Sequence, residues 1–344
     1  MRKLLNTLFV TQPDAYLSLD GDNIVPKLKD DTKLGRVPLH NLEAVVTFGR
    51  GGASPALMGY CAKRNISLTF LTASGKFQAR VIGESKGNVT LRKNQYLLSV
   101  DEHASALIAR NFIIGKVYNS KWMLERMTRD NPLRIDVQHF KEISAHLSDL
   151  LLEIRACENL ERLRGLEGQA ASSYNKLFND MILQQKEDFY FHTRSRRPPL
   201  DKMNAMLSFA YTLLTNDTKA AAESVGLDAY VGFLHRDRPG RASLALDLIE
   251  ELRGIYADRF VLSLVNRKVM KNSDFVTKEN GAILMTDNAR KKFLTAWQEK
   301  KQEQITHPYL GEKMSWGLIP YTQALLLARF LRGDIDEYPP FLWK

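Results

Sequence analysis

The spacing of apolar residues changes at about residue 90, and this change constrains the fold more than any other feature of the sequence. Before it, short apolar runs such as EAVVTFG and ISLTFLT alternate with turn residues, a pattern typical of strands. After it, apolar residues recur at helical spacing over long segments. The sequence therefore predicts an α+β multidomain protein, in which a small β-rich N-terminal domain (1–90) precedes a larger all-α C-terminal domain (91–344).

Local signals support the β-rich part. Residues 15–28, AYLSLDGDNIVPKL, are typical of a hairpin whose turn lies at Asp20–Asn23. Between two strand-like runs, Ser54 stands in front of Pro55, a combination that predicts the start of a helix. The N-terminal segment MRKLLNTLFV lacks a small-residue cleavage site, and we expect it to form a first strand and not a signal peptide.

The C-terminal part contains several predicted helices. One begins at Asp101 and ends at the RDNP sequence near Pro132, and a second covers 137–164. A third covers 201–216, and a fourth begins at Ser243, which we expect to act as its N-cap. The terminal YPPFLW stretch is expected to pack onto the helical domain.

Composition excludes several classes of protein. With 44% apolar and 26% charged residues, the chain is typical of a globular protein, and no apolar run reaches the ~20 residues that span a bilayer. Two cysteines, Cys61 and Cys157, provide neither a disulfide framework nor a thiolate-rich zinc site. We therefore expect a cytoplasmic protein that does not enter the membrane.

The net charge favours an anionic partner. Lys and Arg outnumber Asp and Glu by 49 to 39, a net charge of +10, and a surface of this kind suits a polyanion such as nucleic acid. Part of this charge lies in HTRSRRPP, which contains Arg194, Arg196 and Arg197. This segment is either a solvated basic loop or a set of phosphate contacts.

The segment FLHRDRPGRASLALDLIEELR is the most specific in the chain. His235 precedes a basic turn, and Asp247, Glu250 and Glu251 share the face of the next helix that lies opposite its apolar residues. One interpretation is an ordinary water-facing acidic surface. The other is part of a metal site, because like charges three or four residues apart repel one another unless a cation lies beside them. Arg238 lies in the turn and would suit a phosphate approaching such a metal.

A metal site would need a further carboxylate, because a lone histidine is more often structural. Mixed histidine and carboxylate ligands suit Mn²⁺ or Mg²⁺. Glu167 is a candidate, because it lies between Gly165 and Gly168 in a helical segment where glycine is unfavourable. Those glycines indicate either close packing of another helix or the approach of a bulky ligand.

The glycine-rich stretch FGRGGASP offers a competing function. Gly49, Gly51 and Gly52 precede a helix N-terminus, where a nucleotide phosphate could bind. The stretch lacks both the Lys-Ser/Thr pair of a P-loop and the GxGxxG spacing of a dinucleotide fold. We therefore expect a tight turn.

Four ordered motifs carry a family resemblance: RGLEGQAASSY, NAMLSFAYTLL, GLDAYVGFLH and SLALDLIEELR. Together with the early GASPALMGYCAKRNISLTFLTASGKFQARV and LRKNQ, and the late NARKKFLTAW and YPPFLW, they cover nearly the whole chain. The sequence resembles the CRISPR-associated endonuclease/integrase family (CRISPR-associated protein one), the catalytic one of the two universal spacer-acquisition proteins. Its length and motif style resemble the subtype I-C branch.

The resemblance implies a metal site and a set of partners. It implies a homodimer joined largely through the N-terminal domains, a smaller spacer-acquisition partner protein, and a site for Mg²⁺ or Mn²⁺ in the helical domain. The metal ligands of the family fall on Glu167, His235 and Glu250. Asp247 is a shared acid one turn earlier, as either a second ligand or a residue that supports the ligands.

The activity implied is metal-dependent DNA cleavage and strand transfer. The 3′-hydroxyl ends of a captured double-stranded DNA fragment would be joined into the leader–repeat boundary of a CRISPR array. With the family in view, Arg194, Arg196, Arg197, Arg238 and Arg241 are expected to contact phosphates. The alternative is a non-catalytic, basic DNA-binding or scaffold protein of the same fold.

Overall fold

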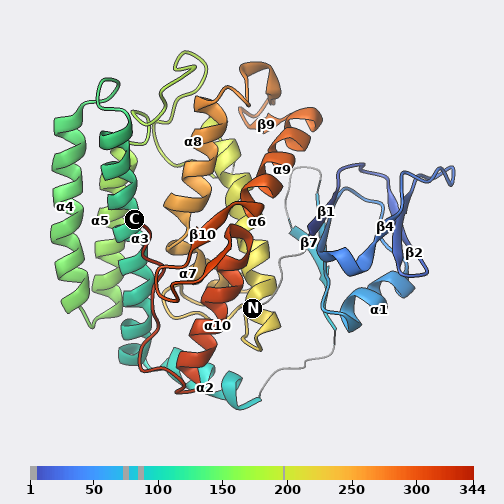
Figure 1. The fold of residues 1–344 in the computed structure, drawn as a ribbon, viewed down its shortest axis with the longest axis horizontal. Helices are drawn as coiled ribbons and strands as arrows, with labels where there is room; N and C mark the ends of the chain where they lie inside the picture. The colour runs from blue at the N-terminus through green and yellow to red at the C-terminus, as the bar shows by residue number, and fades with distance from the viewer. Residues whose placement is uncertain (1–5, 73–76, 84–88, 197) are drawn as a thin grey trace. The chain divides into compact units, whose positions relative to one another are not determined.

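The structure, a computed structural model, describes residues 6–72, 77–83, 89–196 and 198–344 (Figure 1). The strand-rich N-terminal region and the mainly helical C-terminal region confirm the predicted fold class. The chain forms two compact units, one of residues 1–86 with 287–303 and one of residues 87–286 with 304–344.

The first unit contains two sheets. The larger has the order β1-β5-β6-β7, in which β5 pairs in parallel with β1 and β6, and β7 pairs antiparallel with β6. The smaller is antiparallel with the order β2-β3-β4. The elements are β1 (Asn6–Val10), β2 (Tyr16–Asp20), β3 (Asn23–Lys27), β4 (Val37–Pro38), η1 (Leu39–Asn41), β5 (Leu42–Phe48), α1 (Pro55–Lys63), β6 (Ser67–Leu71) and β7 (Phe77–Val81).

Two local predictions in this unit are confirmed. The hairpin of β2 and β3 pairs Asp20 with Asn23 across the turn, where Gly21 adopts a φ of 58°. Ser54 caps α1, because its hydroxyl accepts a hydrogen bond from the Leu57 backbone N–H at 3.2 Å. The glycine-rich stretch before α1 is also tight, since a side chain at Gly51 would collide with the backbone of Ala15.

The first unit also contains a helix from far along the sequence. The segment α9 (Asp287–Gln302) packs on β1, where Gln298 donates to the Thr7 carbonyl at 3.0 Å and Lys301 donates to the Thr7 hydroxyl at 3.2 Å. The helical region predicted as one continuous domain over 91–344 is therefore interrupted. The physical reason is that α9 packs on β1 and is bonded to Thr7, so that it belongs to the β-rich unit.

The second unit is built from long helices. In it α3, α4 and α5 lie side by side, and α6 packs against α7, α8 and α10 (Figure 1). Its helices are α2 (Val89–Val100), α3 (Glu102–Asp130), α4 (Val137–Ala156), α5 (Leu160–Lys176), α6 (Lys202–Ser224), α7 (Ser243–Glu250), the π-helix η2 (Arg253–Asp258), α8 (Arg259–Asn266) and α10 (Ile319–Leu331). Its short elements are η3 (Asn272–Asp274), β8 (Phe275–Thr277), β9 (Ile283–Met285), β10 (Gln304–Thr306), β11 (Lys313–Ser315) and η4 (Trp316–Leu318).

The predicted helix ends are right at α3 and wrong at α4. Asp101 caps α3 by accepting from the backbone N–H groups of His103 and Ala104. The helix predicted over 137–164 is in fact two helices, because the chain is extended at Cys157. Asn159 then caps α5 with a hydrogen bond of 2.9 Å from the Arg162 N–H.

Two further predictions, both on the segment of α7 and η2, are wrong. Ser243 is the first helical residue and not the N-cap, which is Ala242 and makes no side-chain capping bond. Asp247, Glu250 and Glu251 are all buried, so the water-facing interpretation of this acidic surface is wrong. A turn of π-helix follows α7 and changes the winding, an irregularity common at functional sites.

The C-terminal tail is inserted into the helical unit, as expected for YPPFLW, and ends beside α3 (Figure 1). The buried Glu251 carboxylate accepts hydrogen bonds from the Phe341 N–H at 2.6 Å and from the Tyr338 hydroxyl. Asn119 of α3 donates to the carbonyls of Glu251 at 2.6 Å and Phe341 at 2.7 Å. Burial raises the pKa of Glu251 to about 7. The tail thus ties α3 to the end of α7.

The length and hydropathy of a helix indicate whether it could cross a membrane. Among the residues that the structure describes, no helix combines the length and the apolar character needed to cross a bilayer.

Candidate metal and nucleic-acid site

One pocket in the helical unit collects side chains from several helices. Its volume is about 480 Å³, and it is lined by α3, α5, α6, α7 and η2 and by the loops that precede α6 and α7. Arginine and lysine outnumber aspartate and glutamate in this lining. A cavity of this character suits an anionic ligand.

Asp247 organises the loop that carries His235. It is fully buried, and its Oδ2 accepts hydrogen bonds from the backbone N–H groups of Phe233 at 2.6 Å and Leu234 at 3.0 Å. Its Oδ1 accepts from the His235 N–H at 3.0 Å and lies 2.6 Å from His235 Nδ1. The approach requires Gly232, because a Cβ there would lie 2.7 Å from Asp247 Oδ2. Asp247 therefore supports the histidine, and its own oxygens are engaged.

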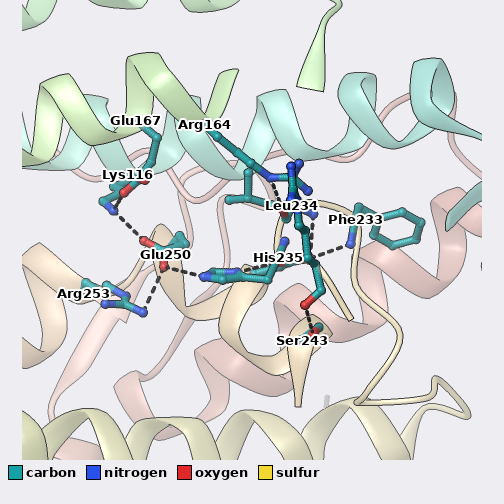
Figure 2. Close-up of polar contacts among 11 residues, drawn as sticks. Lys116, Arg164, Glu167, Phe233, Leu234, His235, Ser243, Glu250 and Arg253 are labelled. Atoms are coloured by element: carbon teal, nitrogen blue, oxygen red, sulfur yellow. Dashed lines mark hydrogen bonds and ion pairs between the residues drawn. The ribbon is translucent and has the colours of Figure 1, made fainter. Parts of the chain in front are cut away.

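The imidazole of His235 is consequently held with Nε2 toward the pocket. Nε2 lies 3.8 Å from Glu250 Oε1, and the histidine side chain is 19% exposed (Figure 2). Arg164 of α5 fixes the same loop from the other side by donating to the Leu234 carbonyl at 2.8 Å. When Nδ1 carries the proton shared with Asp247, Nε2 has a free lone pair, which is the form of histidine that binds metals.

Glu250 lies at the centre of the site. Its side chain is 4% exposed and forms ion pairs with Lys116 Nζ at 2.7 Å and with Arg253 at 2.9 Å (Figure 2). Burial alone would raise the pKa of Glu250, but the neighbouring cations, Arg253 foremost and then Lys116, lower it below the ordinary value. The carboxyl is therefore ionised at neutral pH.

Glu167 reaches the same point from α5. Its Oε1 contacts Lys116 Nζ, so that one ammonium group is shared between Glu167 and Glu250 (Figure 2). Among the residues that the structure describes, no atom of a neighbouring element lies within 4 Å of where a Cβ of Gly165 or Gly168 would stand. The close-packing interpretation of these glycines is therefore wrong.

The donor set at this point has the chemistry of a divalent-metal site. Two carboxylates and an imidazole nitrogen are ligands that Mn²⁺ and Mg²⁺ accept. Across the described ranges, no three histidine, cysteine, aspartate or glutamate side chains already stand in the arrangement of a shared ion. The Lys116 ammonium lies where the two carboxylates face each other. Glu167, His235 and Glu250 fit a metal provided that this ammonium moves.

The predicted arginines have different environments. Arg196 and Arg238 are exposed and line the pocket, and Arg241 lines it from a half-buried position. Arg194 also lines the pocket, but its guanidinium donates to the Asn204 side chain at 2.6 Å. Arg197 lies outside the described residues.

The interpretation of the HTRSRRPP segment as a solvated basic loop is therefore wrong for Arg194, which is half-buried. Besides Asn204, its guanidinium donates to the Ser208 hydroxyl at 3.1 Å and lies 5.4 Å from the centre of the Tyr211 ring. These contacts anchor the loop before α6 onto that helix.

Half-buried Tyr211 and buried Asp258 form another part of the pocket lining. The Tyr211 hydroxyl donates to Asp258 Oδ1, and the Arg253 guanidinium lies 5.0 Å from the centre of the Tyr211 ring. Burial raises the pKa of Asp258 to about 6, although the Tyr211 hydrogen bond and the Arg253 charge oppose the rise. Arg253 therefore contacts both the Tyr211 ring and Glu250.

Comparison with known proteins identifies the family. The family model described as CRISPR associated protein Cas1 matches residues 8–299, which is more than half of the chain. The chain belongs to the Cas1 family. The CRISPR-associated endonuclease Cas1 2 of Rhodospirillum rubrum is 49% identical over 348 residues, and the match covers all of both chains. The CRISPR-associated endonuclease Cas1 1 of Chlorobaculum tepidum is 46% identical over 344 residues, again with both chains fully covered.

Solved structures share the Cas1 fold. A casposase bound to integration product superposes with a TM-score of 0.83 at 24% identity, covering 98% of this chain and 93% of that one. A Cas6-RT-Cas1–Cas2 complex superposes with a TM-score of 0.81 at 22% identity, covering 100% of this chain and 36% of that one. At these identities the likeness shows the fold alone.

Three pocket residues were missed from the sequence: Lys116, Arg253 and Asp258. Lys116 stands in a long helix whose pattern carries no local sign of a site. Arg253 follows the acids of α7 closely in the sequence. Its i, i+3 spacing from Glu250 is the one signal that could have placed it in the site.

Proposed function

We propose that this chain is a divalent-metal-dependent DNA endonuclease and integrase of CRISPR adaptation. The observation that carries the proposal is that Glu167, His235 and Glu250, from separate parts of the sequence, face one another in a cationic pocket. The names of the relatives, both CRISPR-associated endonucleases, point the same way.

The proposed reaction is transesterification at phosphorus. The 3′-hydroxyl of a captured fragment attacks a phosphodiester at the leader–repeat boundary, forming one P–O bond and breaking the bond to the target strand's 3′ oxygen. The attacking hydroxyl loses a proton and the departing 3′ oxygen gains one. Because one phosphodiester replaces another, the step needs no external energy source. With water as the attacking group, the same arrangement would give endonuclease activity.

Glu167, His235 and Glu250 would hold Mg²⁺ or Mn²⁺. When bound, the ion would supply Lewis-acid chemistry, stabilising the negative charge that develops on the phosphate and easing deprotonation of the attacking hydroxyl. Asp247 positions the imidazole through Nδ1. Arg253 holds Glu250 ionised and in place.

The DNA would be held mainly through its phosphates. Arg196 and Arg238 are exposed at the pocket and Arg241 lies beside them, so each could contact a phosphate without reading a base. The double-stranded fragment with 3′-hydroxyl ends and the leader–repeat target would be the two substrates.

The remaining assignments are proposed from the sequence and the family resemblance. They are a homodimer, a smaller spacer-acquisition partner protein in a higher-order complex, a cytoplasmic location and a subtype I-C-like identity. The Cas6-RT-Cas1–Cas2 complex of the same fold supports the partner.

Strand transfer separates this proposal from a non-catalytic DNA-binding scaffold. The chain and its partner protein are incubated with Mn²⁺ or Mg²⁺, a 3′-hydroxyl duplex and a supercoiled target. We expect branched or integrated product, reduced roughly a hundredfold or more by Glu167→Ala or His235→Ala, since a bound metal contributes several kcal/mol to such a step. Glu142→Ala and His139→Ala, in α4 and outside the pocket lining, are the matched controls and should retain activity. Equal inactivity of the unsubstituted chain and the site variants would favour the scaffold.

A further inference from the structure

Lys116 occupies an unusual place for a lysine. Its side chain is 15% exposed, and its ammonium contacts Glu167 Oε1 and lies 2.7 Å from Glu250 Oε2. A buried ion is unfavourable unless it is paired, and here one positive charge is paired with two negative ones. Burial alone would lower the pKa of Lys116, but the charges of Glu250 and then Glu167 raise it above the ordinary value.

The backbone of Lys116 is fixed close to Glu250. On one side of it, a Cβ at Gly115 would lie 2.7 Å from Glu251 Cβ, so α3 makes its close approach to the end of α7 there. On the other side, Asn119 donates to the Glu251 carbonyl at 2.6 Å. The helix therefore cannot withdraw, and only the flexible stem of the lysine can change the position of the ammonium.

We infer that Lys116 is a built-in counter-ion of the metal site, an inference that rests on the proposed function. Without a metal ion, its ammonium holds Glu167 and Glu250 facing each other and offsets their repulsion. A divalent ion bound by both carboxylates would displace the ammonium, because the two cations would claim the same oxygens and repel each other. The ammonium would then move within the pocket it already lines, which also contains Arg196 and Arg238.

This role predicts that removing Lys116 strengthens metal binding, whereas substitution of a residue that contacts a metal site ordinarily weakens it. Mn²⁺ binding to the full chain is measured by isothermal titration calorimetry without DNA. Lys116→Met removes the competing charge and should tighten Mn²⁺ binding by roughly tenfold or more. Lys116→Arg keeps a cation and should bind Mn²⁺ no more tightly than the unsubstituted chain.

The matched control is Lys141→Met. Lys141 of α4 also pairs with a glutamate, Glu125 of α3, but neither residue lines the pocket and the lysine side chain is 52% exposed. Its removal should leave Mn²⁺ affinity unchanged.

Thermal unfolding supplies a second readout. Without metal, Lys116→Met should unfold at a lower temperature than the unsubstituted chain, since it leaves two carboxylates facing each other. Mn²⁺ should raise the unfolding temperature of Lys116→Met by more than it raises that of the unsubstituted chain. If the lysine were purely structural, its substitution would lower the unfolding temperature equally with and without Mn²⁺ and would not tighten Mn²⁺ binding.

Unchanged or weaker Mn²⁺ binding by Lys116→Met overturns the counter-ion role alone. Absence of Mn²⁺ binding by both the unsubstituted chain and Lys116→Met overturns the metal site as well.

Discussion

His235 Nδ1 lies 2.6 Å from Asp247 Oδ1, and the same carboxylate accepts hydrogen bonds from three consecutive backbone N–H groups. The contact fixes both the tautomer and the direction of the imidazole, which leaves Nε2 facing Glu250. Asp247 thus acts on the site through the histidine.

Substitution of Asp247 by asparagine tests this arrangement. The amide oxygen of Asp247→Asn can still accept from the backbone N–H groups of Phe233 and Leu234, which should keep the loop folded. Its NH2 group replaces the oxygen that accepts from His235, and the charge that orients the imidazole is lost. We expect Mn²⁺ affinity to fall by about 10- to 100-fold in a calorimetric titration. Asp237→Asn, at an exposed position of the same loop, should bind Mn²⁺ like the unsubstituted chain. An unchanged Mn²⁺ affinity in Asp247→Asn would show that Asp247 does not position His235 for metal binding.

DNA binding should depend on the exposed arginines of the pocket. The double substitution Arg196→Ala with Arg238→Ala should weaken binding across unrelated sequences. It should also reduce the slope of log K against log salt by about 1 for each arginine that contacts a phosphate. Fluorescence anisotropy at several salt concentrations measures both. A slope equal to that of the unsubstituted chain would exclude these contacts.

Arg194 should behave differently, because its guanidinium is engaged with Asn204 and Ser208. Arg194→Ala removes the guanidinium hydrogen bonds to Asn204 and Ser208 and the contact with the Tyr211 ring, and we expect a loss of about 1–3 kcal/mol in the free energy of unfolding. The salt dependence of DNA binding should stay unchanged. A reduced slope with full stability would instead place Arg194 among the phosphate contacts.

The stability of the helical unit should depend on the ionisation of Asp258. Burial raises its pKa from 3.8 to about 6, so its contribution to stability is fully present below pH 3.8 and is lost as the pH rises through 6. Asp258→Asn retains an acceptor for Tyr211 without the charge. Relative to the unsubstituted chain, this variant should gain stability between pH 4 and 7, by on the order of 3 kcal/mol at most. The free energy of unfolding of both proteins is measured at several pH values. A difference between them that stays constant from pH 4 to 7 would contradict the assignment.

The C-terminal tail should contribute strongly to stability. The Phe341 ring is fully buried and lies 5.3 Å from the His307 ring and 5.9 Å from the Trp316 ring, measured between centroids. Phe341→Ala should cost about 3–5 kcal/mol in urea unfolding, because it leaves a cavity in a packed interior. Leu342→Ala, at a half-buried neighbour, should cost clearly less. A loss below about 1 kcal/mol for Phe341→Ala would mean that the tail is not part of the core.

The sequence was informative where signals are local. The caps at Ser54 and Asp101 and the hairpin turn at Gly21 follow from side chains that bond to their own neighbourhood, so they could be predicted. The break before α5 was missed because Asn159 and its cap bond lie inside an otherwise helical pattern. Ser243 was misjudged because a suitable residue at a helix start need not make the capping bond.

The site could be predicted only in part, for a different reason. The resemblance supplied Glu167, His235 and Glu250, which the fold brings to one pocket. The water-facing interpretation of α7 failed because a helical wheel shows which face is polar but not what covers that face. Lys116 could not be found, since its relation to Glu250 exists only once α3 packs against the end of α7.

The central claim is that Glu167, His235 and Glu250 together bind one divalent ion. Anomalous scattering from a crystal soaked in Mn²⁺ tests it most directly, because the signal locates the metal without assumptions about the protein. The account predicts a peak within coordinating distance of all three side chains, with the Lys116 ammonium displaced from between the two carboxylates. A crystal with no peak in this pocket at saturating Mn²⁺, and with Lys116 still bridging Glu167 and Glu250, would contradict it.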